Sequence, residues 1–363
     1  MSCKKILIIC PFPQGVAAGQ RLKYEQYFNH WRDNGYEIIV SPFMNKFMWK
    51  VVYLKGQYLL KIIGTIIGYF YRLSDLFRIA KYDIVYIHMW VTPFGSTLFE
   101  RIVRVLSKRL IYDIEDNTIT NVGSSVNAII APLKNSNKNK FLMKVADYVI
   151  TSSPVLNKHC LDVNNNKKCK YISSSINIEN FLPVNAYSNN KKVTIGWTGT
   201  FSSKEYLDLL RGVLINLRSR CDFKLLIIGN FEYTFPEMDI EVIQWSKKNE
   251  VSDMQKIDIG IYPLSNDPWV YGKSGLKAIQ YMSFGIPTVA TNIGTTPLII
   301  EHMKNGLLVN SDKDWTESLE ELIKNPKLRK SLGRAARKTV VDRYSTDVIK
   351  MEYFSIISRL CRK

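Results

Sequence analysis

Short apolar runs alternate with helical stretches along this chain, and the whole pattern occurs twice. In the first half the strand-like runs are residues 6–10, 37–43, 84–88, 109–114, 148–152 and 170–173. In the second half they are residues 193–197, 224–228, 241–244, 257–263, 287–290 and 307–309. Strands that alternate with helices form βαβ units, in which the strands pair in parallel. The pattern therefore predicts an α/β protein with two Rossmann-like parallel sheets.

The length of the chain suits two domains of this kind. Its 363 residues exceed the size of one typical core. A polar stretch between Ser173 and Lys192 separates the two sets of strands, and residues 315–363 have a helical pattern only. We expect an N-terminal domain over residues 1–185, a C-terminal domain over 186–345, and a last helix over 346–363 that packs back on the first domain.

Basic residues outnumber acidic residues by 50 to 32, which gives a net charge of +18. A charge this large attracts polyanions, such as nucleic acid, anionic lipid or phosphorylated small molecules. It can also reflect a coding bias toward Lys and Asn. Because no helix-turn-helix, zinc finger or RNP-like motif is evident, we expect no nucleic-acid partner.

The six cysteines are scattered without a C-x-x-C pair, which indicates neither a disulfide framework nor a zinc site. The first apolar run, residues 6–10, is too short for a signal peptide. Both features predict a cytoplasmic protein without a metal site.

One basic and aromatic segment, residues 43–77, has two interpretations. It is rich in Trp, Tyr, Phe, Ile and Leu, and Lys61 keeps it from reaching the roughly 20 apolar residues that a membrane span needs. Such a segment can lie flat on an anionic bilayer. It can also form ordinary helices that pack on the first sheet.

The strongest local motif is G-K-S-G-L-K at residues 272–277, which follows a predicted strand and opens a helix. Free backbone N–H groups at a helix start, together with an ammonium group, form an anion site. Lys273, Ser274 and Gly275 are therefore expected to bind a diphosphate. Lys277 and Gln280 follow on nearly the same face and extend the expected site toward a ribose or sugar hydroxyl. The alternative is that both lysines are solvated charges on a capped helix.

A second candidate is G-W-T-G-T at residues 196–200, where the first strand of the second half ends. Glycine lets a ligand approach the backbone closely, so Gly199 and Thr200 are candidate donor-binding residues. Ser202 and Glu205 have the spacing of a capping box for the next helix. Lys204, in the first turn of that helix, is placed to reach a phosphate. Many βα turns share this pattern.

The first half contributes a loop of small residues at 15–21, directly after the first strand. Within it, Gly19 and Arg21 are candidates for contact with a phosphate or carboxylate. The loop lacks the G-x-G-x-x-G fingerprint of dinucleotide enzymes, which counts against a nicotinamide or flavin cofactor.

Further candidates end two strands of the first half. His88 lies at the carboxyl end of its strand, the edge that faces ligands in open α/β sheets. Asp113, Glu115 and Asp116 end the next strand. Clustered carboxylates there can position an acceptor hydroxyl or act as a base, and they can also cap a helix or loop.

These motifs, in this order, resemble those of GT-B glycosyltransferases, particularly the retaining family 4 (glycosyl transferases group 1). Residues 193–210 resemble the family's opening strand, glycine turn and helix, residues 257–290 its donor-binding region, and N-G-L-L-V at 305–309 its closing strand. The resemblance implies two Rossmann-like domains facing each other across a cleft, with the acceptor on the first and a nucleotide-sugar on the second. It implies that Gly19 and Arg21 lie near the donor phosphates and His88 near the transferred sugar.

The same resemblance implies retaining transfer of a sugar from a nucleotide-diphosphate sugar to a hydroxyl. The expected acceptor is a saccharide or lipid-linked saccharide in the synthesis of a bacterial surface polysaccharide, namely O-antigen of lipopolysaccharide, capsule or exopolysaccharide. Such an acceptor would explain a peripheral contact of residues 43–77 with the anionic inner face of the membrane. No cofactor or metal is expected, since lysines and a helix dipole can neutralise the leaving diphosphate.

The sequence departs from the family pattern in several places. The family's usual Arg and Lys pair on the glycine turn before the donor helix is incomplete. The family usually places two glutamates eight residues apart, where this chain has Gly272 and Gln280, and a further glutamate where it has Leu298. Two alternatives therefore remain: a nucleotide-sugar 2-epimerase on the same fold, and a non-catalytic scaffold that has lost the glutamates.

Overall fold

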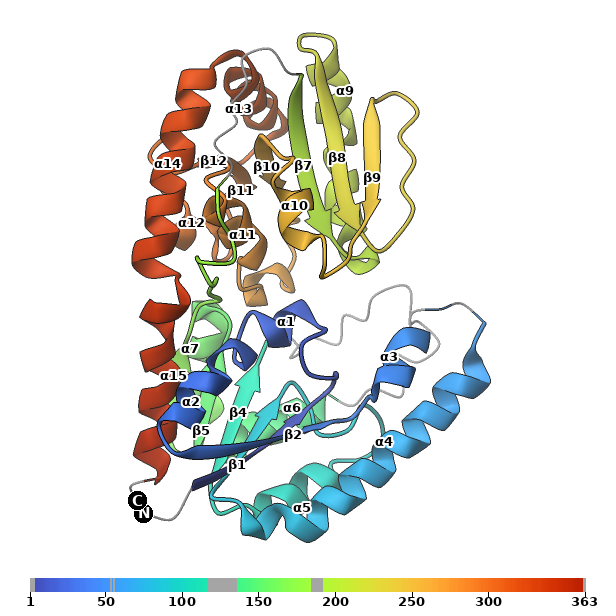
Figure 1. Ribbon diagram of the computed structural model, residues 1–363, viewed down its shortest axis with the longest axis vertical. Coiled ribbons are helices and arrows are strands. Elements are labelled where there is room, and N and C mark those ends of the chain that lie inside the picture. Colours follow the sequence, from blue (N-terminus) through green and yellow to red (C-terminus); the bar gives the residue numbers. More distant parts are fainter. Residues whose placement is uncertain (1–3, 53, 55, 116–135, 184–191, 362–363) are drawn as a thin grey trace. The chain divides into compact units, whose positions relative to one another are not determined.

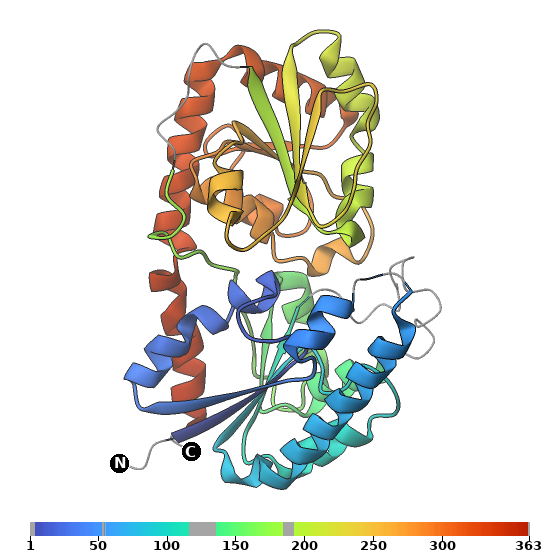
Figure 2. The same ribbon diagram turned by 45° about the vertical axis from the view of Figure 1, so that its right-hand side comes forward.

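The computed structural model describes residues 4–52, 54, 56–115, 136–183 and 192–361. Contacts divide the chain into two compact units, one formed by Met1–Ser173 with Ile349–Lys363 and the other by Ser174–Val348 (Figures 1 and 2). The expected domain boundary at residues 185 and 186 lies outside the described residues.

The first unit is built on a six-stranded parallel sheet in the order β2-β1-β3-β4-β5-β6 (Figure 1). Its strands are β1 (Lys4–Cys10), β2 (Tyr36–Pro42), β3 (Ile84–His88), β4 (Leu110–Ile114), β5 (Tyr148–Thr151) and β6 (Cys169–Tyr171). Its helices are α1 (Ala18–Arg21), α2 (Phe28–Asp33), α3 (Lys46–Val51), α4 (Tyr58–Arg78), α5 (Leu98–Leu106), α6 (Asn137–Val145), α7 (Pro154–Val163) and α15 (Thr346–Cys361).

Both faces of this sheet are covered, which is why its central strands are continuous apolar runs. In β1, Ile6 and Ile8 belong to a core with residues of α2 and α15. Leu7 and Ile9 belong to a separate core with residues of α5, α6 and α7. Alternate residues of one strand therefore pack against opposite layers of helices.

The second unit repeats this architecture with the strand order β12-β11-β10-β7-β8-β9. Its strands are β7 (Val193–Gly199), β8 (Phe223–Gly229), β9 (Ile240–Gln244), β10 (Ile259–Tyr262), β11 (Thr288–Thr291) and β12 (Leu307–Val309). Its helices are α8 (Lys204–Asp208), α9 (Arg211–Arg218), α10 (Glu250–Met254), α11 (Leu276–Ser283), α12 (Thr296–Ile299), α13 (Asp312–Lys324) and α14 (Pro326–Arg343), with short 3₁₀ turns η5 (Phe201–Ser203) and η6 (Val270–Gly272).

The two parallel sheets confirm the predicted α/β fold class, and every strand overlaps its predicted run. The last helix, α15, places Ile349, Tyr353 and Ile356 in the core of the first unit beside residues of β1 and β3. The chain thus leaves the first unit after Ser173 and returns to it with its final helix.

Helices α3 and α4 contain most of the basic and aromatic segment 43–77. None of the helices in the described part of the chain has the length and apolarity that crossing a bilayer requires. Helix α4 packs on α3 and β2, so the segment forms helices on the edge of the first unit (Figure 1).

Candidate functional site

In the second unit, the start of α11 is held in a conformation that requires glycine. Gly275 caps the helix with a φ of 71°, in the left-handed region. A Cβ atom at this position would lie 2.3 Å from Ile299 Cδ1 and 2.9 Å from Thr295 Oγ1. The Thr295 hydroxyl also donates a hydrogen bond to the Lys273 carbonyl, at 2.9 Å. The helix start is therefore fixed against α12 and the turn before it.

We expect Gly275→Ala to destabilise the second unit by about 1–3 kcal/mol, because alanine is strained at positive φ and its Cβ needs occupied space. Thermal unfolding measures the effect. The matched control is Gly212→Ala in α9, where a Cβ meets nothing within 4 Å; there alanine should stabilise by up to about 1 kcal/mol. Equal effects at the two positions would show that the α11 start is not constrained.

Lys273, which precedes α11, and Lys277, in its first turn, both contact residues of β7 and the segment that follows it. The Lys273 Nζ lies over the Tyr206 ring, 5.2 Å from its centre, and the Lys277 Nζ lies 4.7 Å from the centre of the Trp197 ring. Lys277 also donates a hydrogen bond to Ser203 Oγ at 3.2 Å. Both side chains are only partly exposed. The two predicted donor segments, 196–200 and 272–280, are therefore neighbours.

The β7 turn itself is close-packed. A Cβ at Gly199 would lie 2.2 Å from the Trp197 ring, so a larger residue would displace that ring. The capping box in this turn joins Thr200 and Ser203 at the ends of η5. The expected box of Ser202 and Glu205 is wrong, because the chain begins to coil two residues earlier than predicted.

Three predicted donor residues have protein partners or are buried. The Lys204 Nζ pairs with Asp208 Oδ2 at 2.6 Å and lies over the Tyr233 ring. Gln280, which is 8% exposed, donates to Glu250 Oε1 at 3.5 Å, and Ser274 is also 8% exposed. In the structure Lys204 therefore pairs with Asp208 and Gln280 with Glu250, and their donor-binding role stays a prediction.

In the first unit, the predicted residues at the carboxyl ends of β3 and β4 do lie together. His88 Nδ1 is 3.8 Å from Asp113 Oδ2, and its Nε2 is 3.9 Å from Glu115 Oε2. The imidazole is 1% exposed, and its ring centre lies 5.0 Å from that of Tyr24. The Glu115 carboxylate therefore lies beside Nε2. Asp116 lies outside the described residues.

Asp113 is a fully buried carboxylate with several partners. Lys23 and Tyr86 both donate to it, Lys23 to Oδ1 and Tyr86 to Oδ2. Burial by itself raises the pKa of Asp113, but the Lys23 ammonium and His88 outweigh it and lower the pKa to about 2. Asp113 is therefore ionised at neutral pH and serves a buried ion pair, which differs from the expectation of a carboxylate open to an acceptor.

The loop that carries Gly19 and Arg21 is closed by buried polar side chains. Gln20 exchanges hydrogen bonds with the backbone of Phe12 and donates to Glu25. Glu25 in turn accepts from the Gly15 N–H at 2.8 Å. A Cβ at Gly19 would lie 2.7 Å from Glu115 Oε2. The loop is thereby fixed beside the group of His88, Asp113 and Glu115.

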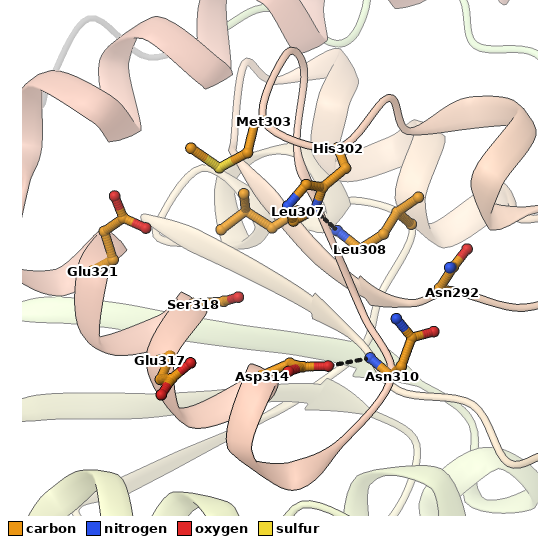
Figure 3. A pocket seen from close by; sticks show the side chains of 10 residues that line it. All are labelled: Asn292, His302, Met303, Leu307, Leu308, Asn310, Asp314, Glu317, Ser318 and Glu321. Carbon is orange, nitrogen blue, oxygen red and sulfur yellow. Dashed lines mark hydrogen bonds between the residues drawn. The ribbon is translucent and has the colours of Figure 1, made fainter.

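A surface cavity of about 480 Å³ lies elsewhere in the second unit, between β12 and α13 (Figure 3). Two of its polar groups have structural partners: His302 Nδ1 accepts from the Leu308 N–H, and Asp314 accepts from the Asn310 N–H (Figure 3). No predicted donor residue lines this cavity. Among the residues that the structure describes, no group of three or more His, Cys, Asp or Glu could hold a metal ion.

Comparison with known sequences identifies relatives of this chain. Residues 181–339 match the family described as glycosyl transferases group 1. An uncharacterized glycosyltransferase of Methanocaldococcus jannaschii is 28% identical over 217 residues, which cover 55% of this chain and 58% of that protein. The chain spans about half the length of the curated relatives that it matches.

Solved structures match nearly the whole chain. Sucrose-phosphate synthase from Thermosynechococcus elongatus superposes with a TM-score of 0.74 at 14% identity, covering 98% of this chain and 99% of that one. Anabaena HepE, solved in complex with UDP-glucose, superposes with a TM-score of 0.66 at 14% identity and the same coverage. These likenesses confirm the predicted GT-B fold, and the sequence matches confirm the resemblance to glycosyl transferases group 1.

Proposed function

Because this chain has the GT-B fold and its second unit matches glycosyl transferases group 1, we propose that it is a retaining glycosyltransferase. It moves a sugar from a nucleotide-diphosphate sugar to a hydroxyl acceptor. The second unit binds the donor and the first binds the acceptor. The reaction needs no metal or other cofactor.

The donor assignment is supported by the lysines at the start of α11, since Lys273 reaches Tyr206 of α8 and Lys277 reaches Trp197 of β7. Two ammonium groups beside the N–H groups of a helix start favour a diphosphate over any neutral ligand. In this proposal the donor also approaches the backbone of Gly199 and Thr200. Gly275 allows α11 to begin beside them. In this proposal the positive charge stabilises the leaving nucleoside diphosphate without a metal ion.

The group of His88, Asp113 and Glu115 in the first unit is proposed to contact the reacting sugar and the acceptor. We place His88 next to the transferred sugar. Asp113 lies beside Nδ1 and orients the imidazole, and Glu115 is the carboxylate that can turn toward an acceptor. Gly19 and Arg21 form the loop that meets the donor phosphates. Lys23 acts as a positioning residue, because its ammonium keeps Asp113 ionised.

The acceptor in this proposal is a saccharide or lipid-linked saccharide of a bacterial surface polysaccharide, made at the inner face of the cell membrane. The protein is cytoplasmic and associates with that face peripherally. The support is the exposed apolar and basic character of α3 and α4. A lipid-linked acceptor would require the enzyme to work at a membrane surface.

A ligand screen followed by a turnover assay tests the function. Nucleoside diphosphates are first screened by thermal shift, and the sugar nucleotides of the stabilising bases are then incubated with membrane lipid extract. Proton NMR of the product should show the anomeric configuration of the donor. Inversion of that configuration would contradict the retaining mechanism. Isomerisation of the sugar nucleotide without an acceptor would identify an epimerase instead.

We expect His88→Gln to lower the turnover number by about 100-fold, since removing one group that stabilises developing charge costs about that much. Affinity for nucleoside diphosphate should stay unchanged, because His88 is placed next to the transferred sugar and does not contact the diphosphate. Steady-state kinetics and a binding titration separate the two effects. His159→Gln, in α7 of the same unit, is the control and should leave both unchanged. A wild-type turnover number in His88→Gln would show that His88 takes no part in the reaction.

A further inference from the structure

Helix α4 exposes its apolar side chains, whereas an ordinary surface helix buries them. Its exposed large side chains form one stripe at helical spacing: Leu59, Ile62, Ile63, Ile66, Phe70, Leu73 and Phe77. Leu59 is 70% exposed and Phe77 is 86% exposed. The buried residues of the helix are Gly64, Gly68, Arg72 and Asp75. The apolar side of α4 therefore faces away from the core of the first unit.

Close packing of the glycines explains how the helix can be held in this orientation. A Cβ at Gly64 would lie 2.8 Å from Met48 Cγ, and one at Gly68 would lie 2.5 Å from the Phe43 ring. The α4 backbone thus lies directly against α3 and the end of β2. Any larger residue at these two positions would push the helix away.

A buried polar network adds to this packing. Arg72 donates to the carbonyls of Cys10 and Val91 and to Asp75, at 2.9, 2.7 and 2.8 Å. Asp75 also accepts from Ser41 and Arg78. A buried arginine with these partners defines one orientation of the helix, so the outward stripe is a consequence of specific contacts.

The charge of α3 and α4 favours an anionic partner for the stripe. Within the bounds of α3 and α4, all of which are described, the one acidic residue is Asp75, and it is buried between Arg72 and Arg78. The basic residues Lys46 and Lys50 of α3 are exposed and Lys61 of α4 is partly exposed. Such a surface is attracted to anionic lipid. A second copy of this chain would bring the same positive charges against one another.

We propose that the outward stripe of α4 is the surface by which the protein lies on an anionic lipid bilayer. The inference rests on the peripheral membrane contact proposed above and assigns it to this one face. The apolar side chains enter the boundary between headgroups and acyl chains, and the positive charge of the lysines of α3 and α4 attracts the protein to the anionic surface. Tyr58 and Tyr71 are also exposed, and tyrosine favours this boundary. The catalytic residues take no part in the contact.

Cosedimentation with vesicles tests the proposal. The probes are vesicles of phosphatidylcholine alone and vesicles with equal parts phosphatidylcholine and phosphatidylglycerol. Wild-type protein should bind the vesicles that contain phosphatidylglycerol more tightly than the vesicles of phosphatidylcholine alone. Ile66→Gln with Phe70→Gln should weaken that binding about tenfold or more, because two apolar side chains no longer enter the lipid. Lys46→Gln with Lys50→Gln should weaken it by about tenfold at low salt.

The matched control is Ile215→Gln with Met351→Gln, which removes side chains of 45% and 53% exposure from α9 and α15. It should bind like wild type. All variants should keep the wild-type melting temperature, since the substituted side chains are exposed. The proposal would be overturned if the Ile66 and Phe70 variant bound the anionic vesicles as tightly as wild type does. It would also be overturned if the wild-type protein formed a dimer in solution and these substitutions made that dimer dissociate. The thermal shift with nucleoside diphosphate is measured in parallel, and its absence would contradict the transferase function alone.

Discussion

Replacing Lys273 and Lys277 together by alanine should lower the affinity for nucleoside diphosphate by about 100-fold or more. A hydrogen bond to a charged group contributes about 1.5–3 kcal/mol, and each 1.4 kcal/mol is a factor of about ten. Wild-type protein at a ligand concentration of about 100 Kd should gain roughly 2.7 kcal/mol of stability, and the variant should lose most of that gain. Thermal shift and isothermal titration measure both quantities.

The control for this pair is Lys304→Ala with Lys313→Ala, which removes the same charge from the same unit at side chains that are 75% and 80% exposed. It tests whether general electrostatic attraction explains the loss. Lys204→Ala is a second comparison, and because Lys204 already pairs with Asp208, we expect a small effect. If the control weakens binding as much as the Lys273 and Lys277 variant, the diphosphate does not bind at the α11 start.

Asp113→Asn should destabilise the first unit by about 3–5 kcal/mol, since it leaves the Lys23 ammonium buried without a counter-charge. For a unit of this size the melting temperature should fall by roughly 10 °C. The exposed pair of Lys5 and Glu37, at 3.3 Å in the same unit, supplies the control. Glu37→Gln should change stability by less than about 1 kcal/mol.

A double variant and an acid titration extend this test. Lys23→Met with Asp113→Asn removes both charges, so it should recover much of the stability that Asp113→Asn loses. Because the folded pKa of Asp113 is about 2 and its ordinary value is 3.8, its contribution is complete above pH 4 and is lost as the pH falls toward 2. Asp113→Asn should lack this part of the acid dependence. Equal stability of Asp113→Asn and Glu37→Gln would contradict the buried ion pair.

The strands were predictable because their signal is local. A strand buried on both faces must be a continuous apolar run, and each run in this sequence became a strand of a parallel sheet. The start of α11 was also predicted from the G-K-S-G-L-K motif, whereas the positive φ of its N-cap Gly275 was seen only in the structure. Fold class and family resemblance follow from such features in their order along the chain.

The partners of the charged side chains were not predictable, because they depend on residues far away in sequence. Lys23 lies 90 positions from Asp113, and buried lysine is too uncommon to be expected from sequence. The sequence made Lys204, Lys273 and Lys277 candidate donor-binding residues without separating them. In the structure Lys204 pairs with Asp208, whereas Lys273 lies over Tyr206 and Lys277 over Trp197. The aromatic residues Trp197 and Tyr206, which position these lysines, gave no distinct pattern of their own.

Helix α4 shows where sequence information ends. Its amphipathic period is the same whichever face points inward, so periodicity determined that a two-sided helix forms and left its orientation open. Gly64 and Gly68 allow close approach of α3 and β2, and Arg72 finds its acceptors on strands and loops distant in the chain. Only these tertiary contacts turned the apolar face outward, because the free energy of each contact depends on atoms that local sequence does not bring together.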